Sequence, residues 1–234
     1  MYKGEHSPRS VRTRTVTAVI PAWNEATTVG AVVYAALDAA FVDDVVVVDN
    51  ASSDATAAVA AAHGARVVYE PVPGKGEAMR AGVDAAPGSE VIVFLDADLV
   101  GLRPHHVDRL VAPVLGHDVD MACGLFDRGP FANPLFLRRL PVLTGQRAVR
   151  RWLFEQLDAH DLRGYRVEAA LNSLVAQRGL VRRDEVVPGL WHRPKQQKLD
   201  SPVVGHATKL KMLASACWSY LRFAVARRAV QPAG

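Results

Sequence analysis

Short apolar runs alternate with amphipathic segments through the first hundred residues of the chain. Four of these runs have the length and the β-branched composition of buried strands. They cover residues 15–20, 45–48, 65–69 and 91–95. The segments between them are rich in Ala and Val and begin or end at capping residues and glycines, which predicts helices. Alternating strands and helices predict right-handed crossovers and an α/β fold, with a mostly parallel, Rossmann-like sheet flanked by helices.

The intervening segments predict three helices. The first runs to residue 40 with Asn24 as its N-cap, the second is short with Asp54 as its cap, and the third covers residues 77–86. A glycine-bearing loop, Pro73-Gly74-Lys75-Gly76, precedes the third helix. This loop leaves Lys75 free to approach a ligand, although a plain solvated lysine is an equally good interpretation.

The second half of the chain is less regular. Its pattern predicts helices at 104–115 and 166–178, strands at 119–125 and 180–187, two helical pieces within 135–157 joined at 144–147, and a loop from residue 191. No stretch has the composition of a linker between two domains. We therefore expect a disordered basic arm at 1–14, a single domain at 15–206, and a basic amphipathic helix at 207–234.

Composition is ordinary for a soluble globular protein, with 50% hydrophobic and 22% charged residues among 234. The net charge of +4 is compatible with an anionic substrate or membrane surface, and nothing indicates nucleic-acid binding. No apolar run is long enough to span a membrane. Cys123 and Cys217 are far apart, which predicts free thiols in a reducing compartment. We expect a cytoplasmic protein, with peripheral contact at the inner membrane face as an alternative.

Two carboxylates follow directly on the apolar run at 91–95. Asp96 and Asp98 are separated by one residue, and open parallel sheets bind their ligands at the carboxyl ends of the strands. Hard oxygen donors suit Mg²⁺ or Mn²⁺, which takes the rest of its ligand shell from phosphates and water. The pattern predicts a metal–diphosphate site. The alternative is a pair of solvated carboxylates that cap the next helix.

Polar residues also end the two preceding strands. Asn24 and Glu25 follow the first strand, and Asp49 ends the second. A helix N-terminus at such a place offers backbone N–H groups to an anion, and a nearby carboxylate suits ribose hydroxyls. Each residue alone is explained equally well by helix capping. Their meeting at one sheet edge predicts a nucleotide site.

The order of these motifs resembles the family 2 glycosyltransferases of the GT-A fold. The motifs are Val-Ile-Pro-Ala-Trp-Asn-Glu (19–25), Val-Val-Asp-Asn-Ala-Ser-Ser-Asp-Ala-Thr (47–56), Gly-Lys-Gly-Glu-Ala-Met (74–79) and Phe-Leu-Asp-Ala-Asp-Leu (94–99). Looser similarity continues through residues 144–147, 164–168 and 191–192. Within the family the chain is most similar to the glucosyl-3-phosphoglycerate synthases and the dolichyl-phosphate sugar synthases. It departs from the family pattern at Asn50, where Asp is common, and at Trp23, where Tyr is usual.

The resemblance implies a donor pocket for a nucleotide-diphosphate sugar, with UDP favoured over GDP. Glu25 would bind the ribose, Asp49 the base, and Lys75 the base or the diphosphate. The remaining substrate-binding candidates of the donor motifs are Pro21, Ala22, Asn24 and Asp96.

The resemblance also implies a metal site. Asp98 would bind Mg²⁺ or Mn²⁺ directly, Asp96 would touch the ribose or the metal, and His192 would reach the metal from late in the chain. A neutral imidazole is a reasonable ligand for Mn²⁺. As a lone histidine in a predicted loop, His192 is almost as well explained by a structural or exposed role.

A basic cluster predicts the acceptor side, because guanidinium groups suit phosphate. A solvated helix face is the alternative. Glu168 is implied to bind acceptor or sugar hydroxyls and is a catalytic candidate together with Asp98, and Asp158 and Asp161 are alternative general bases. The cluster comprises Gln146, Arg147, Arg150 and Arg151.

These observations predict a metal-dependent transfer of a hexose to a phosphorylated acceptor, either phosphoglycerate-like or a polyprenyl phosphate. The helix at 207–234 would lie in a membrane interface or pack on the protein or on a second subunit. A nucleotidyltransferase would need a glycine- and arginine-rich triphosphate loop, which residues 21–25 do not resemble. A non-catalytic nucleotide-sugar binding module would have no need of Asp96, Asp98 and His192.

Overall fold

The computed structural model describes residues 15–127, 129, 144–162 and 166–193. The expected arm at 1–14 and the expected helix at 207–234 lie outside these residues. The expected domain at 15–206 is therefore described up to residue 193, with the internal gaps given above.

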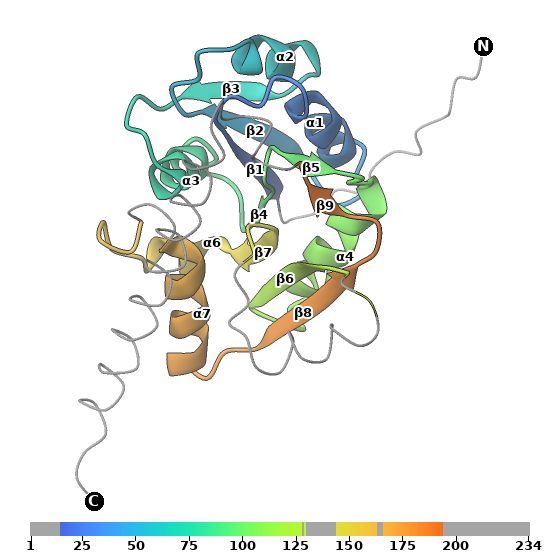
Figure 1. The fold of residues 1–234 in the computed structure, drawn as a ribbon. Helices are drawn as coiled ribbons and strands as arrows, with labels where there is room; N and C mark the ends of the chain where they lie inside the picture. The colour runs from blue at the N-terminus through green and yellow to red at the C-terminus, as the bar shows by residue number, and fades with distance from the viewer. Residues whose placement is uncertain (1–14, 128, 130–143, 163–165, 194–234) are drawn as a thin grey trace, which may run out of the picture.

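A seven-stranded mixed sheet forms the centre of the described fold (Figure 1). The strand order is β3-β2-β1-β4-β7-β6-β8, and every neighbouring pair is parallel except those that involve β7. The strands are β1 (Val16–Ala22), β2 (Asp44–Asp49), β3 (Arg66–Tyr69), β4 (Val91–Phe94), β6 (Met121–Phe126), β7 (Arg147–Arg150) and β8 (Arg182–Val187). A separate two-stranded ladder joins β5 (Leu99–Val100) to β9 (Trp191–His192). The predicted α/β class with a mostly parallel sheet is confirmed.

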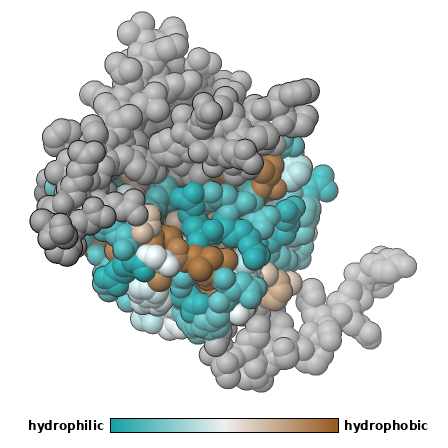
Figure 2. Space-filling model, turned by 90° about the horizontal axis from the view of Figure 1, so that it is seen from below, coloured by the Kyte–Doolittle hydropathy of each residue, from teal (hydrophilic) through white to brown (hydrophobic). Residues whose placement is uncertain are grey.

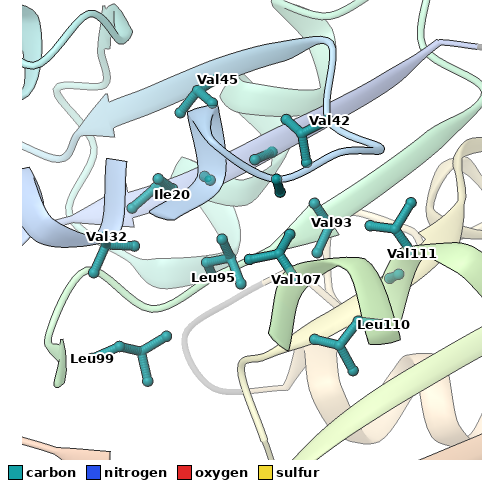
Figure 3. Close-up of a cluster of buried hydrophobic side chains, with 14 of the residues drawn as sticks. Ile20, Val32, Val42, Val45, Val93, Leu95, Leu99, Val107, Leu110 and Val111 are labelled. Atoms are coloured by element: carbon teal, nitrogen blue, oxygen red, sulfur yellow. The ribbon is translucent and has the colours of Figure 1, made fainter. Parts of the chain in front are cut away.

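Helices cover both faces of the sheet, as its alternating apolar side chains require. One face carries α1 (Val29–Leu37), α2 (Thr56–Ala62) and α4 (Pro104–Leu115), and the other carries α3 (Lys75–Asp84), α6 (Arg151–Glu155) and α7 (Val167–Gln177). Within β1, Ala18 and Ile20 face the first layer while Val19 faces the second. Figure 3 shows the first core, where side chains of α1 and α4 meet those of β1, β2 and β4.

Several predicted elements are confirmed, and others are corrected. The strands at 15–20, 45–48, 65–69 and 91–95 and the helix at 104–115 are present within a few residues. Residues 147–150, where we expected the second helical piece to begin after the joint at 144–147, instead form β7, which pairs antiparallel with both β4 and β6. A run of only four residues has no periodicity that separates a strand from a helix. The expected loop at 191–192 is β9.

Two helix starts also differ from prediction. The N-cap residue of α1 is Thr28, whereas Asn24, the expected cap, has a left-handed backbone (φ 54°). Helix α3 begins at Lys75, two residues before the expected start at residue 77. Asn is one of the few residues besides Gly that accept this conformation readily. The second change moves Lys75 from the expected loop into the first turn of a helix.

The surface has a mixed character. Figure 2 shows one face, on which hydrophilic residues surround a small apolar area. Trp23, Tyr34, Tyr69 and Trp191 are among the large apolar residues that are more than half exposed in the described chain. None of the helices in the described residues is long and apolar enough to cross a membrane.

A glycine on α3 allows this helix to pack closely on the sheet. A Cβ atom at Gly82 would lie 2.3 Å from Val19 Cγ1 and 3.0 Å from Val48 Cγ2, both in the buried core. Because well-packed interiors yield little, added methyl groups at such a place force shifts of neighbouring atoms.

We expect Gly82→Val to lower the free energy of unfolding by about 2–3 kcal/mol, the upper range for overpacking a core. The matched control is Gly88→Val, because a Cβ at Gly88 meets no atom within 4 Å. Urea denaturation measures both. Equal stability of the two variants would contradict the proposed close contact of α3 with β1 and β2.

Candidate functional site

The candidate site lies where strands β1 and β4 separate at their carboxyl ends. The β1–β4 ladder stops at Val19 and Phe94, whereas the β1–β2 ladder continues to Ala22 and Asp49. Pro21 has no N–H, and it falls beyond the last residue of β1 that is paired to β4. Strand order reverses at this point of the sheet, which is where open α/β sheets form their ligand crevice. The predicted candidates Pro21, Ala22 and Asp49 therefore lie at one edge.

Asp96 lies just past the end of β4, and donors hold both of its carboxylate oxygens. Lys75 Nζ is 2.8 Å from Oδ1, and Gln146 Nε2 donates to Oδ2 at 2.6 Å. Gln146 Oε1 lies 2.6 Å from Thr144 Oγ1, and the amide presents its nitrogen to Asp96 because an ionised carboxylate only accepts hydrogen bonds. The fully buried Gln146 thus fixes the orientation of Asp96.

Lys75 joins two halves of the site. Its ammonium lies 2.8 Å from Asp96 Oδ1 and 2.8 Å from Glu168 Oε1 in the first turn of α7. Burial alone would lower the pKa of the Lys75 ammonium, but the two carboxylates outweigh it and hold the pKa well above its usual value. Lys75 is therefore a permanent cation and cannot act as a base. The expected mobile lysine of a loop is instead the fixed first residue of a helix.

Glycines make room for this ion cluster. A Cβ at Gly145 would lie 2.2 Å from Asp96 Oδ1, and one at Gly76 would lie 1.5 Å from the Leu162 carbonyl oxygen. Any side chain at either position would displace the carboxylate or push α3 away from the segment before α7. Gly76, directly after Lys75, thus serves the close packing of α3.

Asp98 and His192 form the second part of the site. His192 Nδ1 donates to Asp98 Oδ1 at 2.8 Å, and Nε2 lies 3.8 Å from Asp96 Oδ2. Strand β9 brings His192 beside Leu99 of β5, and the Phe126 ring packs edge-on against the imidazole at 4.5 Å between centroids. The structure thus joins the three predicted residues of the metal site.

These residues fit a divalent cation. One ligand atom from each of Asp96, Asp98 and His192 lies within 4.8 Å of the others. Carboxylate oxygens with one imidazole nitrogen are donors that suit Mn²⁺ and, less commonly, Mg²⁺. Asp96, Asp98 and Glu168 carry three negative charges, and the Lys75 ammonium between Asp96 and Glu168 offsets one of them, so about two remain for one such ion to neutralise.

The opposite side of the crevice holds the other donor-site candidates. Glu25 is 7% exposed and accepts from Thr28 Oγ1 at 3.2 Å, and Asp49 is also 7% exposed and accepts from the Ser52 backbone N–H. Asn24 Oδ1 accepts from the Ser53 N–H at 2.8 Å, which ties the loop after β1 to the loop after β2. Asn24 is therefore a brace between two loops rather than the expected helix cap.

The arginines of the predicted acceptor cluster form bonds within the fold. Arg147 is fully buried, and its guanidinium donates to the carbonyl oxygens of Thr144 at 2.6 Å and Glu168 at 3.3 Å. Arg150 lies 3.4 Å from Asp120, and Arg151 donates to backbone carbonyls at the end of α3. These arginines join elements of the fold, so their geometry gives no support to the predicted phosphate-binding role of Arg147 and Arg150.

The sequence interpretation missed several supporting residues. Thr144 orients Gln146, Phe126 packs on His192, and Asn50 binds the loop that precedes Lys75. Phe126 follows a predicted strand and carried no signal of its own, whereas Thr144 begins the segment 144–147 that resembles the family. Asn50 did carry a signal, because it was noted as a departure from the family pattern.

Comparison with known proteins agrees with this geometry. The model of the family described as "Glycosyl transferase family 2" matches residues 17–177. Glucosyl-3-phosphoglycerate synthase of Mycolicibacterium smegmatis is 39% identical over 126 residues, which cover 49% of this chain and 41% of that protein. An uncharacterized glycosyltransferase of Mycobacterium bovis is 49% identical over 83 residues, or 36% of each chain. The chain thus spans about two fifths of the length of the curated relatives it matches.

Solved structures cover more of the chain. Glucosyl-3-phosphoglycerate synthase of Mycobacterium tuberculosis, crystallised with Mn²⁺, UDP-glucose and phosphoglyceric acid, has a TM-score of 0.72 at 30% identity. That match covers 89% of this chain and 80% of the other. The same enzyme with Mg²⁺ and UDP gives a TM-score of 0.70 at 28% identity, over 95% of this chain and 82% of the other.

We expect Mn²⁺ with UDP to raise the melting temperature of the wild-type chain and not that of Asp98→Asn. A ligand at about 100 times its Kd stabilises by about 2.7 kcal/mol, or roughly 5–10 °C for a chain of this size. His192→Ala should weaken metal affinity by about tenfold to a hundredfold.

The matched control for this measurement is Asp158→Asn. Asp158, His160 and Asp161 form the other group of possible metal ligands among the described residues. The Asp158→Asn variant should keep the wild-type response to Mn²⁺. A full response in Asp98→Asn would rule out the metal assignment.

Proposed function

Because this chain belongs to glycosyl transferase family 2, we propose that it moves a hexose from a UDP-sugar to a phosphorylated acceptor, with Mg²⁺ or Mn²⁺ as cofactor. The observation that carries the proposal is the cluster of Asp96, Asp98 and His192 beside the Lys75–Glu168 ion pair. The relative from Mycobacterium tuberculosis was crystallised with UDP-glucose, Mn²⁺ and phosphoglyceric acid. Glucose is accordingly the hexose we propose.

In this proposal the nucleoside and the diphosphate of the donor bind at different strand ends of the crevice. Glu25 and Asp49 bind the ribose and the base, since both are nearly buried carboxylates at the carboxyl ends of β1 and β2. Asp98 and His192 would hold the metal, whose charge offsets the negative charge that develops on the leaving diphosphate. Asp96 lies between these groups, and Lys75 and Gln146 keep it in one orientation.

Glu168 is the group we assign to the acceptor side. Its carboxylate is 6% exposed and accepts from Lys75, so it can also accept a hydrogen bond from a hydroxyl group. We assign Glu168 the orientation of the acceptor hydroxyl or of a sugar hydroxyl of the donor.

The phosphorylated character of the acceptor rests on the relatives named above rather than on the arginines at 147–151, which are engaged elsewhere.

The two acceptor classes, a soluble phosphoglycerate and a lipid-linked polyprenyl phosphate, differ in solubility. Release of UDP from UDP-glucose, measured with and without Mn²⁺, distinguishes them when 3-phosphoglycerate and a polyprenyl phosphate are supplied in turn. No Mn²⁺-dependent UDP release with either acceptor would count against the proposed reaction.

We expect Glu25→Ala and Asp49→Ala each to raise the KM for UDP-glucose about tenfold, with kcat changed less. A lost hydrogen bond to a nucleoside is worth about 1–1.5 kcal/mol, and the nucleoside changes little between the ground and transition states. Steady-state kinetics with varied donor measures this.

Asp44→Ala is the matched control, because Asp44 is a carboxylate at the other end of β2 that pairs with Arg66. Its donor KM should equal that of the wild type. A loss confined to kcat in Glu25→Ala or Asp49→Ala would show that these residues act in the chemical step, and the donor pocket would need to be reassigned.

A further inference from the structure

The segment that leads into Lys75 is held by one buried side chain. Asn50 follows the last residue of β2 and is 6% exposed. Its Nδ2 group donates to the carbonyl oxygens of Glu70 at 3.0 Å and Val72 at 2.7 Å, and its Oδ1 accepts from the Gly74 N–H at 2.7 Å. One side chain therefore binds three backbone groups within the five residues between β3 and α3.

The chemistry of these contacts requires a primary amide. Two carbonyl oxygens need two N–H donors, and one N–H needs an oxygen acceptor, and a primary amide supplies both kinds of group on one side chain. A reversed amide would place Oδ1 against two carbonyl oxygens, so the orientation is determined. An Asp carboxylate has no N–H to offer and would repel both carbonyl oxygens while it kept the bond from Gly74.

The backbone of the segment offers few other attachments. Pro71 and Pro73 have no N–H. The Glu70 N–H donates to the Asp49 carbonyl oxygen at 3.0 Å, and the Val72 N–H donates to the Glu70 side chain. Of the segment's three N–H groups, only that of Gly74 is left for Asn50, directly before helix α3 begins.

These contacts determine where helix α3 begins, and Lys75 is its first residue. Gly74 is the N-cap residue of α3. The Lys75 ammonium must reach Asp96 and Glu168 together, at 2.8 Å from each. A shift of the helix start by a fraction of a turn would break at least one of these two ion pairs.

We propose that Asn50 is a positioning residue, whose amide sets the start of α3 and so holds Lys75 between the donor half and the acceptor half of the site. Its effect on catalysis rests on the function proposed above. Its effect on the position of Lys75 does not. The departure from Asp at this position is thus a functional feature of this chain.

The first test needs no substrate. Lys75 is the only lysine between Lys3 and Lys195, so its peptide is identified without ambiguity by mass spectrometry. Acetylation by a reactive ester should be slow at Lys75 in the wild type, because the amine is held between two carboxylates at 2.8 Å from each. We expect it to become about tenfold faster in Asn50→Ala through local opening, with Asn50→Asp between the two.

The control variant is Ser89→Ala, which removes a buried hydrogen bond of 2.5 Å to Thr17 at the other end of the sheet. It should lower stability without changing the labelling of Lys75. Labelling of Lys75 at the wild-type rate in both Asn50 variants would overturn the proposal, whatever reaction the enzyme catalyses.

The second test uses the reaction. Asn50→Asp should raise the KM for UDP-glucose by about tenfold, whereas Ser89→Ala should not change it. If Asn50 acts through Lys75, the change should nearly vanish in a Lys75→Met background, because coupled residues are not additive. Additive effects on donor affinity would show that Asn50 does not act through Lys75. If Lys75 is labelled faster in the Asn50 variants but the wild type shows no turnover, the proposed function is refuted while the positioning role of Asn50 stands.

Discussion

The site depends on the balance of charge around one partly buried ammonium. Lys75 lies between Asp96 after β4 and Glu168 on α7, two carboxylates that come from opposite halves of the chain. Without this cation the two carboxylates would stand close together with little water to separate their charges, which is costly in a protein interior. Glycines at 76 and 145, the Gln146 amide and the Asn50 amide all serve to keep these groups at hydrogen-bonding distance.

In the proposed function, one crevice serves both the donor and the acceptor. The donor candidates Glu25 and Asp49 lie at the ends of β1 and β2, and the acceptor candidate Glu168 lies on the opposite layer of helices. Antiparallel β7 enters the sheet between β4 and β6, and it brings Thr144 to Gln146 alongside Asp96. A fully parallel sheet would have placed another crossover helix there instead of polar side chains.

The arginines show how context changes the role of a charged residue. The sequence places Arg147, Arg150 and Arg151 next to a motif of the family, which suggests a site for phosphate. In the fold, β7 turns Arg147 into the interior, where it donates to two backbone carbonyl groups, and the flanking arginines join β6 and α3. A guanidinium with five donors is well suited to such structural bonds as well as to anions.

Local sequence pattern determined most strands and helices of the first hundred residues. The buried runs in the first hundred residues, the helix at 104–115, and the carboxylates that follow the strand at 91–95 are all written in neighbouring residues, since periodicity and capping act over a few positions. Because parallel strands end at a common edge, the meeting of Glu25, Asp49 and Asp96 also followed from the order of elements. Tertiary structure alone decided which charges pair. The His192–Asp98 bond spans 94 positions, and the Asn50–Gly74 bond spans 24. Such contacts arise only when separate elements pack, so no local pattern could have identified β9 as the strand that brings His192 to Asp98 or α3 as the helix that fixes Lys75.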